Sequence, residues 1–147
     1  MTISAPELDV ANQLATGLAL ALGGTWSVGT NIKLGPPRDS SIPGAEGVRV
    51  WCMPWNGGPP APYLGGPEAG SLMQSQVQVV VQSAAGDDFE AGLTVARAVR
   101  NVVHTHEPTS EYSGAWALES EPLYLGPQDS GQHSFSVNVR LVWKRSF

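Results

Sequence analysis

The residues whose chemistry needs to be considered first are three histidines. His104 and His106 stand two positions apart and His133 follows later, so a fold that joined them could hold a metal ion. No cysteine or carboxylate motif with ligand spacing accompanies them. Histidines near the end of a helix also stabilise the helix dipole without any ligand. We therefore expect neither a metal nor another cofactor.

Two acidic groups are the other candidates for chemistry. Glu119 and Glu121 have the two-residue period that places side chains on one face of a strand, where paired carboxylates can act as acid and base. Asp87, Asp88 and Glu90 precede an expected helix, where helix capping explains them. A solvated sheet face explains the first pair, and no partner for either group stands nearby in the sequence. We expect no catalytic residue.

The glycine and serine motifs also fail to support an enzyme. The Gly-Gly pairs lack the following lysine of a phosphate-binding loop and the strand-to-helix context of a dinucleotide site. No Gly-x-Ser-x-Gly sequence is present to support serine hydrolysis. These absences favour a protein that functions through its surfaces.

Length and composition limit the possibilities further. The 147 residues suit one domain, spanning 1–147, and 14% charged residues is well below the usual share of about a quarter. A net charge of −5 argues against recognition of nucleic acid. The lone Cys52 excludes an intrachain disulfide and fits a reducing compartment, where it would be a small buried side chain. Polar residues interrupt and flank the apolar run Leu8–Leu22, so we expect a cytosolic, soluble protein without a membrane anchor.

The elements that must position these residues centre on one strand and one helix. Between Met73 and Ser83, valines alternate with glutamines, which is the pattern of a strand with one apolar and one polar face. Between Phe89 and Val103, apolar residues recur at steps of three and four, which predicts an amphipathic helix. The apolar stripe of the helix is expected to pack on the valine face of the strand.

The other segments complete the expected architecture. Ala5–Leu22 has a second helical stripe, Asn31–Leu34 a short strand and Val48–Met53 a strand with apolar side chains on both faces. An extended segment from Trp116 to Leu125 and a final strand from His133 to Lys144 are expected to form a hairpin. This order predicts an α+β domain, with an antiparallel sheet of about four strands and both helices on one face.

One long segment rich in proline and glycine, Pro54–Gly70, is predicted to be a loop without ladder or helix. It carries Trp55, Tyr63 and Leu64, which a disordered spacer would seldom contain. We expect these side chains to contact another protein, although the alternative that the rings fold back over the core stays open.

Several of these features together resemble a known family. A valine-rich strand, the Asp-Phe-x-Ala helix start at Asp88–Ala91 and the turn Gly126-Pro127-x-Asp129-x-Gly131 before Phe135-x-Val137-x-Val139 resemble the tail terminator (tail-completion) proteins of long-tailed bacteriophages. The N-terminal helix also fits, and the resemblance covers most of the chain except the Pro54–Gly70 loop.

The resemblance implies a structural virion protein of the tail or neck, made in the cytoplasm of the bacterial host. Such proteins are α+β and form a ring, usually a hexamer, that caps the tail tube, ends its polymerisation and meets the head connector. The partners implied are therefore further copies of the chain, the tail tube protein and the head–tail connector protein. No catalytic residues are carried over. Arg140, Lys144 and Arg145, at the basic end of the last strand, are added as interface candidates that could meet acidic residues of a neighbour.

Two alternatives remain at this stage. The chain could be a head–tail joining or stopper protein of the same particle, or a small enzyme or ligand-binding domain. Its mass in solution would separate the assembly proteins from the third class, and micrographs of particles would distinguish the first two.

Overall fold

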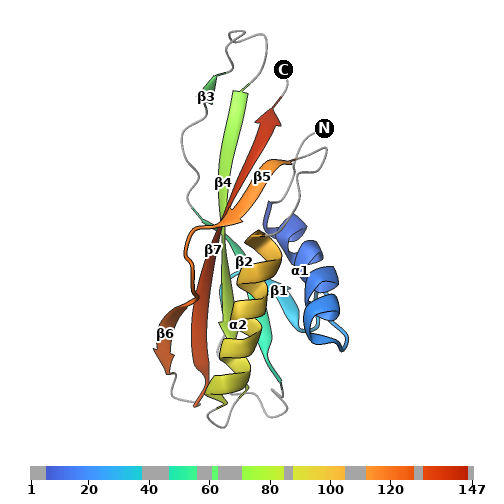
Figure 1. Ribbon diagram of the computed structural model, residues 1–147, viewed down its shortest axis with the longest axis vertical. Coiled ribbons are helices and arrows are strands. Elements are labelled where there is room, and N and C mark those ends of the chain that lie inside the picture. The colour runs from blue at the N-terminus through green and yellow to red at the C-terminus, as the bar shows by residue number, and fades with distance from the viewer. Residues whose placement is uncertain are drawn as a thin grey trace.

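The computed structural model describes residues 6–37, 47–55, 61–62, 71–84, 88–104, 112–127 and 131–145. Its helices and strands follow the order α1 (Pro6–Leu22), β1 (Ile32–Leu34), β2 (Arg49–Trp55), β3 (Ala61–Pro62), β4 (Ser71–Gln82), α2 (Phe89–His104), β5 (Tyr112–Ala117), β6 (Leu123–Pro127) and β7 (His133–Arg145). Figure 1 shows long strands behind two helices that lie on the same face of one sheet. The α+β class and the placement of both helices on one face are confirmed.

The sheet is larger than expected and is not purely antiparallel. Seven strands of the described residues take part, in the order β1-β2-β4-β7-β5, with β3 paired to β4 and β6 paired to β7. β1 is parallel to β2, whereas the other pairs are antiparallel. The prediction of about four antiparallel strands was therefore wrong. The two residues of β3 are too few to establish a period of two, and the extended segment expected from Trp116 to Leu125 belongs to two strands, β5 and β6.

The strand β7 lies inside the sheet, with paired strands on both sides over most of its length. One side of β7 pairs with β4 over twelve residue pairs, from Ser71↔Arg145 to Gln82↔Ser134. On its other side, β5 pairs with the C-terminal half of β7 and β6 with the N-terminal half. The expected hairpin of the last two strands is confirmed for β6 and β7.

The predicted single strand from Trp116 to Leu125 is interrupted, and the interruption contains both acidic candidates. Glu119 Oε1 accepts a hydrogen bond from Asn138 Nδ2 at 2.8 Å, and Glu119 Oε2 accepts one from Asn138 N at 3.3 Å. Glu121 forms an exposed ion pair with Arg97 of α2 at 3.1 Å. The two carboxylates thus have separate structural roles, and the prediction that they share a strand face was wrong.

The core lies between the helices and the valine face of the sheet, as predicted. Val77, Val79 and Val81 of β4 are fully buried, and Phe135, Val137 and Val139 of β7 join them. The buried residues of the helices are Val10, Ala11, Leu14 and Leu18 of α1 and Gly92, Val95, Ala96, Val99 and Val103 of α2. Burying these apolar side chains is the main stabilising contribution to the fold.

The start of α2 follows the expected capping pattern. The carbonyl of Asp88 accepts the first helical hydrogen bond, from Gly92 N at 3.3 Å, which gives Asp88 the N-cap position. Phe89, the first helical residue, then packs its ring against Tyr124, His133 and Phe135. The N-terminus of the helix is thereby attached to the β6–β7 hairpin.

The predicted loop Pro54–Gly70 begins later than expected. Pro54 and Trp55 continue β2 and pair with Val77 and Gln76 of β4, while the backbone of Ala61–Pro62 pairs with Ser71–Leu72. The prediction that no ladder forms here was wrong at these positions. A proline is tolerated in a strand where no ladder hydrogen bond requires its amide. Tyr63 and Leu64 lie outside the described residues.

The buried thiol of Cys52 gives a testable consequence of this packing. Burial, and to a smaller extent the negative charge of Glu7, raises the pKa of the Cys52 thiol from 9.0 to about 12. Because the folded state holds this proton more tightly, its contribution to stability is present below pH 9 and is lost as the pH rises toward 12. Alkylation by iodoacetamide at pH 8 should be very slow in the folded protein and fast in denaturant.

The matched variant for this prediction is Cys52→Ala, which removes the titrating group. Melting temperatures measured from pH 8 to pH 11 should fall less steeply with pH for this variant than for the unaltered chain. Only the unaltered chain loses the contribution of the Cys52 thiol over this range, whereas all other side chains are the same in both proteins. Equal slopes, or rapid alkylation of the native thiol at pH 8, would contradict the assigned burial.

Candidate functional site

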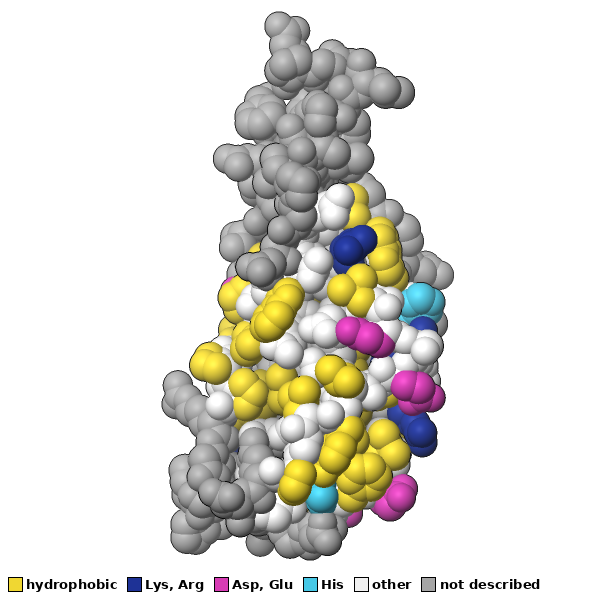
Figure 2. Space-filling model, turned by 90° about the vertical axis from the view of Figure 1, so that its left-hand side faces the viewer, with side chains coloured by type: hydrophobic (Ala, Val, Ile, Leu, Met, Phe, Trp, Pro, Cys, Tyr) yellow, Lys and Arg dark blue, Asp and Glu magenta, His cyan; other side chains and the backbone are white. Residues whose placement is uncertain are grey.

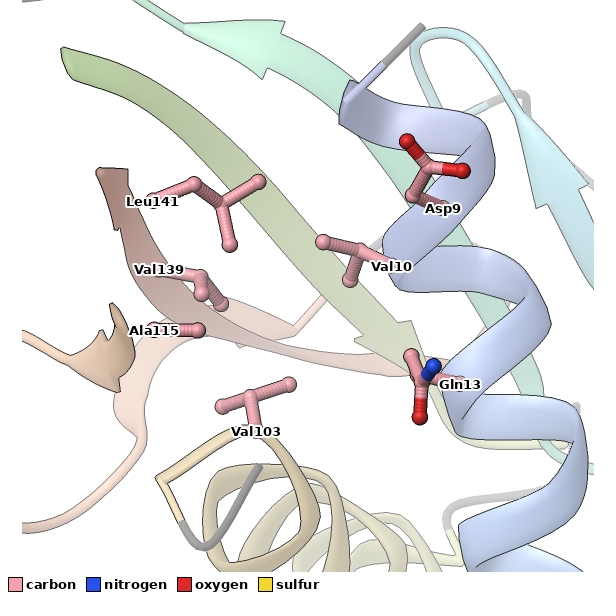
Figure 3. Close-up of a pocket in the computed structure, with 7 residues that line it drawn as sticks. All are labelled: Asp9, Val10, Gln13, Val103, Ala115, Val139 and Leu141. Carbon is pink, nitrogen blue, oxygen red and sulfur yellow. The ribbon is translucent and has the colours of Figure 1, made fainter. Parts of the chain in front are cut away.

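The recess between the helices and the sheet is too small for a substrate. Figure 3 shows side chains of both helices and the sheet pointing toward it. It is lined by Asp9, Val10, Gln13, Val103, Ala115, Val139 and Leu141. Its volume of about 10 Å³ is close to the minimum for one water molecule. This recess is a packing gap and offers no room for an organic ligand.

The two described histidines lie at opposite ends of α2. His104 is the last residue of the helix and is exposed, whereas His133 packs against Phe89 at the first residue. Sixteen residues of helix separate these ends by roughly 24 Å, at 1.5 Å per residue. His133 Nδ1 is instead hydrogen-bonded to the hydroxyl of Tyr124 at 2.7 Å. Within the described residues, no group of three or more His, Cys, Asp or Glu side chains is arranged to hold a metal ion.

The most distinctive surface is the sheet face turned away from the helices, which we call the back face. It carries the residues that alternate with the buried valines, and Figure 2 shows hydrophobic side chains in several groups on the side of the molecule bearing β6. Leu123 and Leu125 of β6 are 55% and 49% exposed, and Trp55 of β2 is 50% exposed. Exposed apolar side chains gathered on one face are a feature of protein interfaces.

A row of four side chains crosses the back face. Trp55 is in register with Gln76, Gln76 with Arg140, and Arg140 with Trp116. Neighbouring strands are about 4.8 Å apart, so the two indoles lie at the ends of a row that spans roughly 14 Å. Trp116 is 36% exposed, and Arg140 is half-buried between Gln76 and Trp116. Tryptophan and arginine are the residue types most enriched among the energetically dominant residues of interfaces.

Two buried polar atoms beside this row have no hydrogen-bond partner within the described part of the chain. They are Arg140 Nε and Asn138 Oδ1, which belong to alternate residues on the back face of β7. A buried donor or acceptor left unpaired costs about 1–3 kcal/mol, and more when the group is charged. The back face therefore holds a buried guanidinium nitrogen that has no partner within the described residues, in the same row as the exposed rings of Trp55 and Trp116.

A hollow of about 290 Å³ lies on the same face. It is lined by Pro37, Met53, Gln78, Val80, Leu125, Gly126, Pro127 and Ser134. Beside it, Trp51 is buried, with its indole Nε1 donating to Gln82 Oε1 at 2.7 Å and Lys33 Nζ lying 5.8 Å from the ring centre. The tryptophan keeps this part of the face rigid, because its ring is packed and its polar atom is paired.

The structure brings together only part of the predicted interface set. Trp55 and Arg140 belong to one row, although Arg140 lies in the middle of β7 and not at a basic end. The backbone of Lys144 and Arg145 pairs with Leu72 and Ser71 at the far end of the sheet. Tyr63 and Leu64 lie outside the described residues.

Sequence reasoning missed Trp116 as a surface residue, together with the exposed leucines of β6 and α1. Trp116 lies between Ala115 and Ala117, which are both buried in the core. In a strand with a period of two, Trp116 must therefore lie on the opposite face. Leu20 could have been recognised as a surface residue because it does not belong to the apolar stripe of α1 that is buried. It is 84% exposed.

Comparison with known proteins identifies a shared fold. No protein-family model and no curated protein sequence matches this chain. Among solved structures, the chain is similar to one chain of the virion of a native gene transfer agent particle, with a TM-score of 0.59 and 16% identity. The superposition covers 96% of each chain, so the likeness extends through the whole domain. None of the described helices is long and apolar enough to cross a membrane.

Proposed function

We propose that this protein is a non-enzymatic structural component of a virion, which forms a ring that caps the tail tube, ends tube polymerisation and joins the tail to the head connector. The observation that carries the proposal is the end-to-end fold likeness to a chain of a gene transfer agent virion. The order of elements that resembles phage tail terminators supports the finer assignment. The ring has six copies in this proposal, as the resemblance implies.

The surface chemistry agrees with this proposal. The gap between the helices and the sheet is too small for a substrate, and the larger hollows of about 440 and 290 Å³ have no carboxylate, histidine or cysteine among their lining residues. The described residues meanwhile expose tryptophans and leucines on the back face. A ring made of identical subunits uses a heterologous contact, in which one surface of each copy meets a different surface of the next. Such a protein functions through its contacts, with the tail tube protein on one side and the connector protein on the other.

The first measurement is the mass of the purified protein by light scattering, alone and with tail tube protein. We expect a closed species near six times the 15.5 kDa of one chain. Raising the ionic strength to 1 M should reduce the fraction of rings, because salt screens exposed charge pairs. A monomer at every concentration, with and without tube protein, would contradict the proposal.

The position in the particle is tested by polymerising tube protein in the presence of increasing amounts of this protein. We expect shorter tubes, each with a cap at one end visible in micrographs. Binding to connectors with no effect on tube length would instead identify a stopper protein of the neck.

A further inference from the structure

The sheet has two edges at which a strand of another molecule could be added. β1 forms one edge, and β5 and β6, which pair with the same side of β7, form the other (Figure 1). An unpaired edge presents a row of backbone N–H and C=O groups that can pair with another chain. These edges therefore decide whether the protein meets its neighbours by extending the sheet or through its side chains.

The β1 edge is closed by the chain itself. Ile32 N donates to Ser27 O at 3.2 Å, and Ile32 O accepts a hydrogen bond from Gly29 N at 2.6 Å. Next to β1, Cys52 O of β2 points to this side of the sheet, because it accepts a bond from the residue that follows β1. Pro54, two positions further along β2, has the same direction and no N–H to donate. This edge offers little for an added strand.

The β5 and β6 edge is interrupted by extra residues. Ala117 lies opposite Val139 and Leu123 lies opposite Ser136, so the five residues 118–122 stand where β7 has only two. We call the segment 118–122 the edge bulge. The strands on either side of it, with the sequences YSGAWA and LYLGP, contain no charged residue. Charges are a common protection of an edge strand, and bulges are another.

Side-chain hydrogen bonds hold the edge bulge against β7. Leu118 N donates to Asn138 O at 2.9 Å, as in a regular ladder. The carboxylate of Glu119 then accepts from Asn138 N at 3.3 Å and from Asn138 Nδ2 at 2.8 Å. On the helix side, Arg100 Nε donates to the carbonyl of Glu119 at 3.2 Å. The carboxylate thus takes the N–H of β7 that the carbonyl of a continuous strand would accept.

The free backbone groups beside the edge bulge form a short run. Because Asn138 directs its backbone toward this edge, Arg140 does the same, and Trp116 opposite it is bonded to β7. Ala115 and Ala117 therefore direct their N–H and C=O groups away from the sheet. The edge bulge ends this run on one side, and the register shift near the start of β5 ends it on the other. The run is shorter than a typical strand of about 5–6 residues.

We infer that the edge bulge prevents strand pairing at this edge, so that neighbouring molecules in an assembly contact the chain through side chains and do not extend its sheet. The inference goes beyond the proposed ring, because it follows from the backbone of one chain and applies in any assembly. It assigns Glu119 the role of a positioning residue, which holds the extra residues in place.

Hydrogen exchange of the purified, assembled protein tests the free edge directly. With amides resolved by mass spectrometry and electron-transfer fragmentation, the N–H groups of Ala115 and Ala117 should exchange at least about tenfold faster than that of Trp116, since unpaired amides are less protected. Protection of both alanine amides to the level of Trp116 would overturn the inference, because it would show that another strand is paired there.

Deleting residues 119–121 tests the edge bulge itself. The deletion removes the three extra residues and brings β5 and β6 into one register along β7. By light scattering, this variant should form species of at least about twice the mass of those of the unaltered chain at the same concentration, because a long edge without charges pairs readily. Adding Leu118→Lys to the deletion should reverse this association, since a charge on the merged edge opposes pairing.

The matched control is the double variant Glu119→Ser and Glu121→Ser, which removes both charges and keeps the length of the edge bulge. It should have the mass of the unaltered protein. Circular dichroism and thermal melting establish that each variant is folded. A folded deletion variant with unaltered mass, or a serine variant that associates as strongly as the deletion, would overturn the inference. If the deletion variant does not fold, the exchange rates decide. A monomeric unaltered protein would contradict the proposed ring and leave this inference in place.

Discussion

Replacing Val79 by aspartate should abolish folding of the isolated chain. Val79 is fully buried in β4, in register with Cys52 on one side and Val137 on the other. A carboxylate at this position would be surrounded by apolar side chains, and burying it unpaired costs several kcal/mol. The total stability of a domain is about 5–15 kcal/mol, so this single change removes most or all of it.

The matched control is Gln74→Asp, which places the same side chain in the same strand but on the back face, where Gln74 is only partly buried. This variant should keep its secondary structure and lose only about 1 kcal/mol, the scale of strand propensity. Far-ultraviolet circular dichroism and thermal melting distinguish the two results. A cooperative melt of the Val79→Asp variant near the native temperature would show that the core face has been assigned incorrectly.

Replacing Gly17 by alanine should destabilise the protein, although alanine is the better helix former. A Cβ at Gly17 would overlap the side chain of Val102 in α2, with Val102 Cγ2 at 2.9 Å. Because valine has one strongly preferred rotamer in a helix, the helices must separate to relieve the overlap. Alanine gains about 1 kcal/mol of helix propensity, but overpacking costs about 1–3 kcal/mol. With an overlap this severe we expect a net loss of about 1–2 kcal/mol, from those two magnitudes.

Thr16→Ala is the control for this experiment, because Thr16 is the exposed neighbour of Gly17 in α1. It should be neutral or slightly stabilising, since it improves helix propensity without a new contact. For a domain of this size, a loss of 1 kcal/mol lowers the melting temperature by roughly 2–4 °C. An increase in melting temperature on Gly17→Ala would mean that the helices do not approach as closely as described.

The sequence by itself determined the two helices, the two longest strands, β4 and β7, and the face of each that is buried. The stripes of α1 and α2 and the valine alternation of β4 and β7 extend over twelve or more residues, so that the period of each is unambiguous. The interface candidate Trp55 is 50% exposed, and its contact with another protein stays a prediction. Local periodicity is sufficient here because each element has only one apolar side to bury.

Only the tertiary structure decided how the strands are ordered and which surface residues become neighbours. The row of Trp55, Gln76, Arg140 and Trp116 joins residues up to 85 positions apart, and it depends on the register of three strand pairs. The sequence placed Arg140 at a basic strand end, whereas pairing on both sides places it inside the sheet. Glu119 likewise acquires its role by bonding to Asn138 across a break between strands. Registers of this kind follow from packing between distant segments, and a one-residue shift would move every side chain to the opposite face.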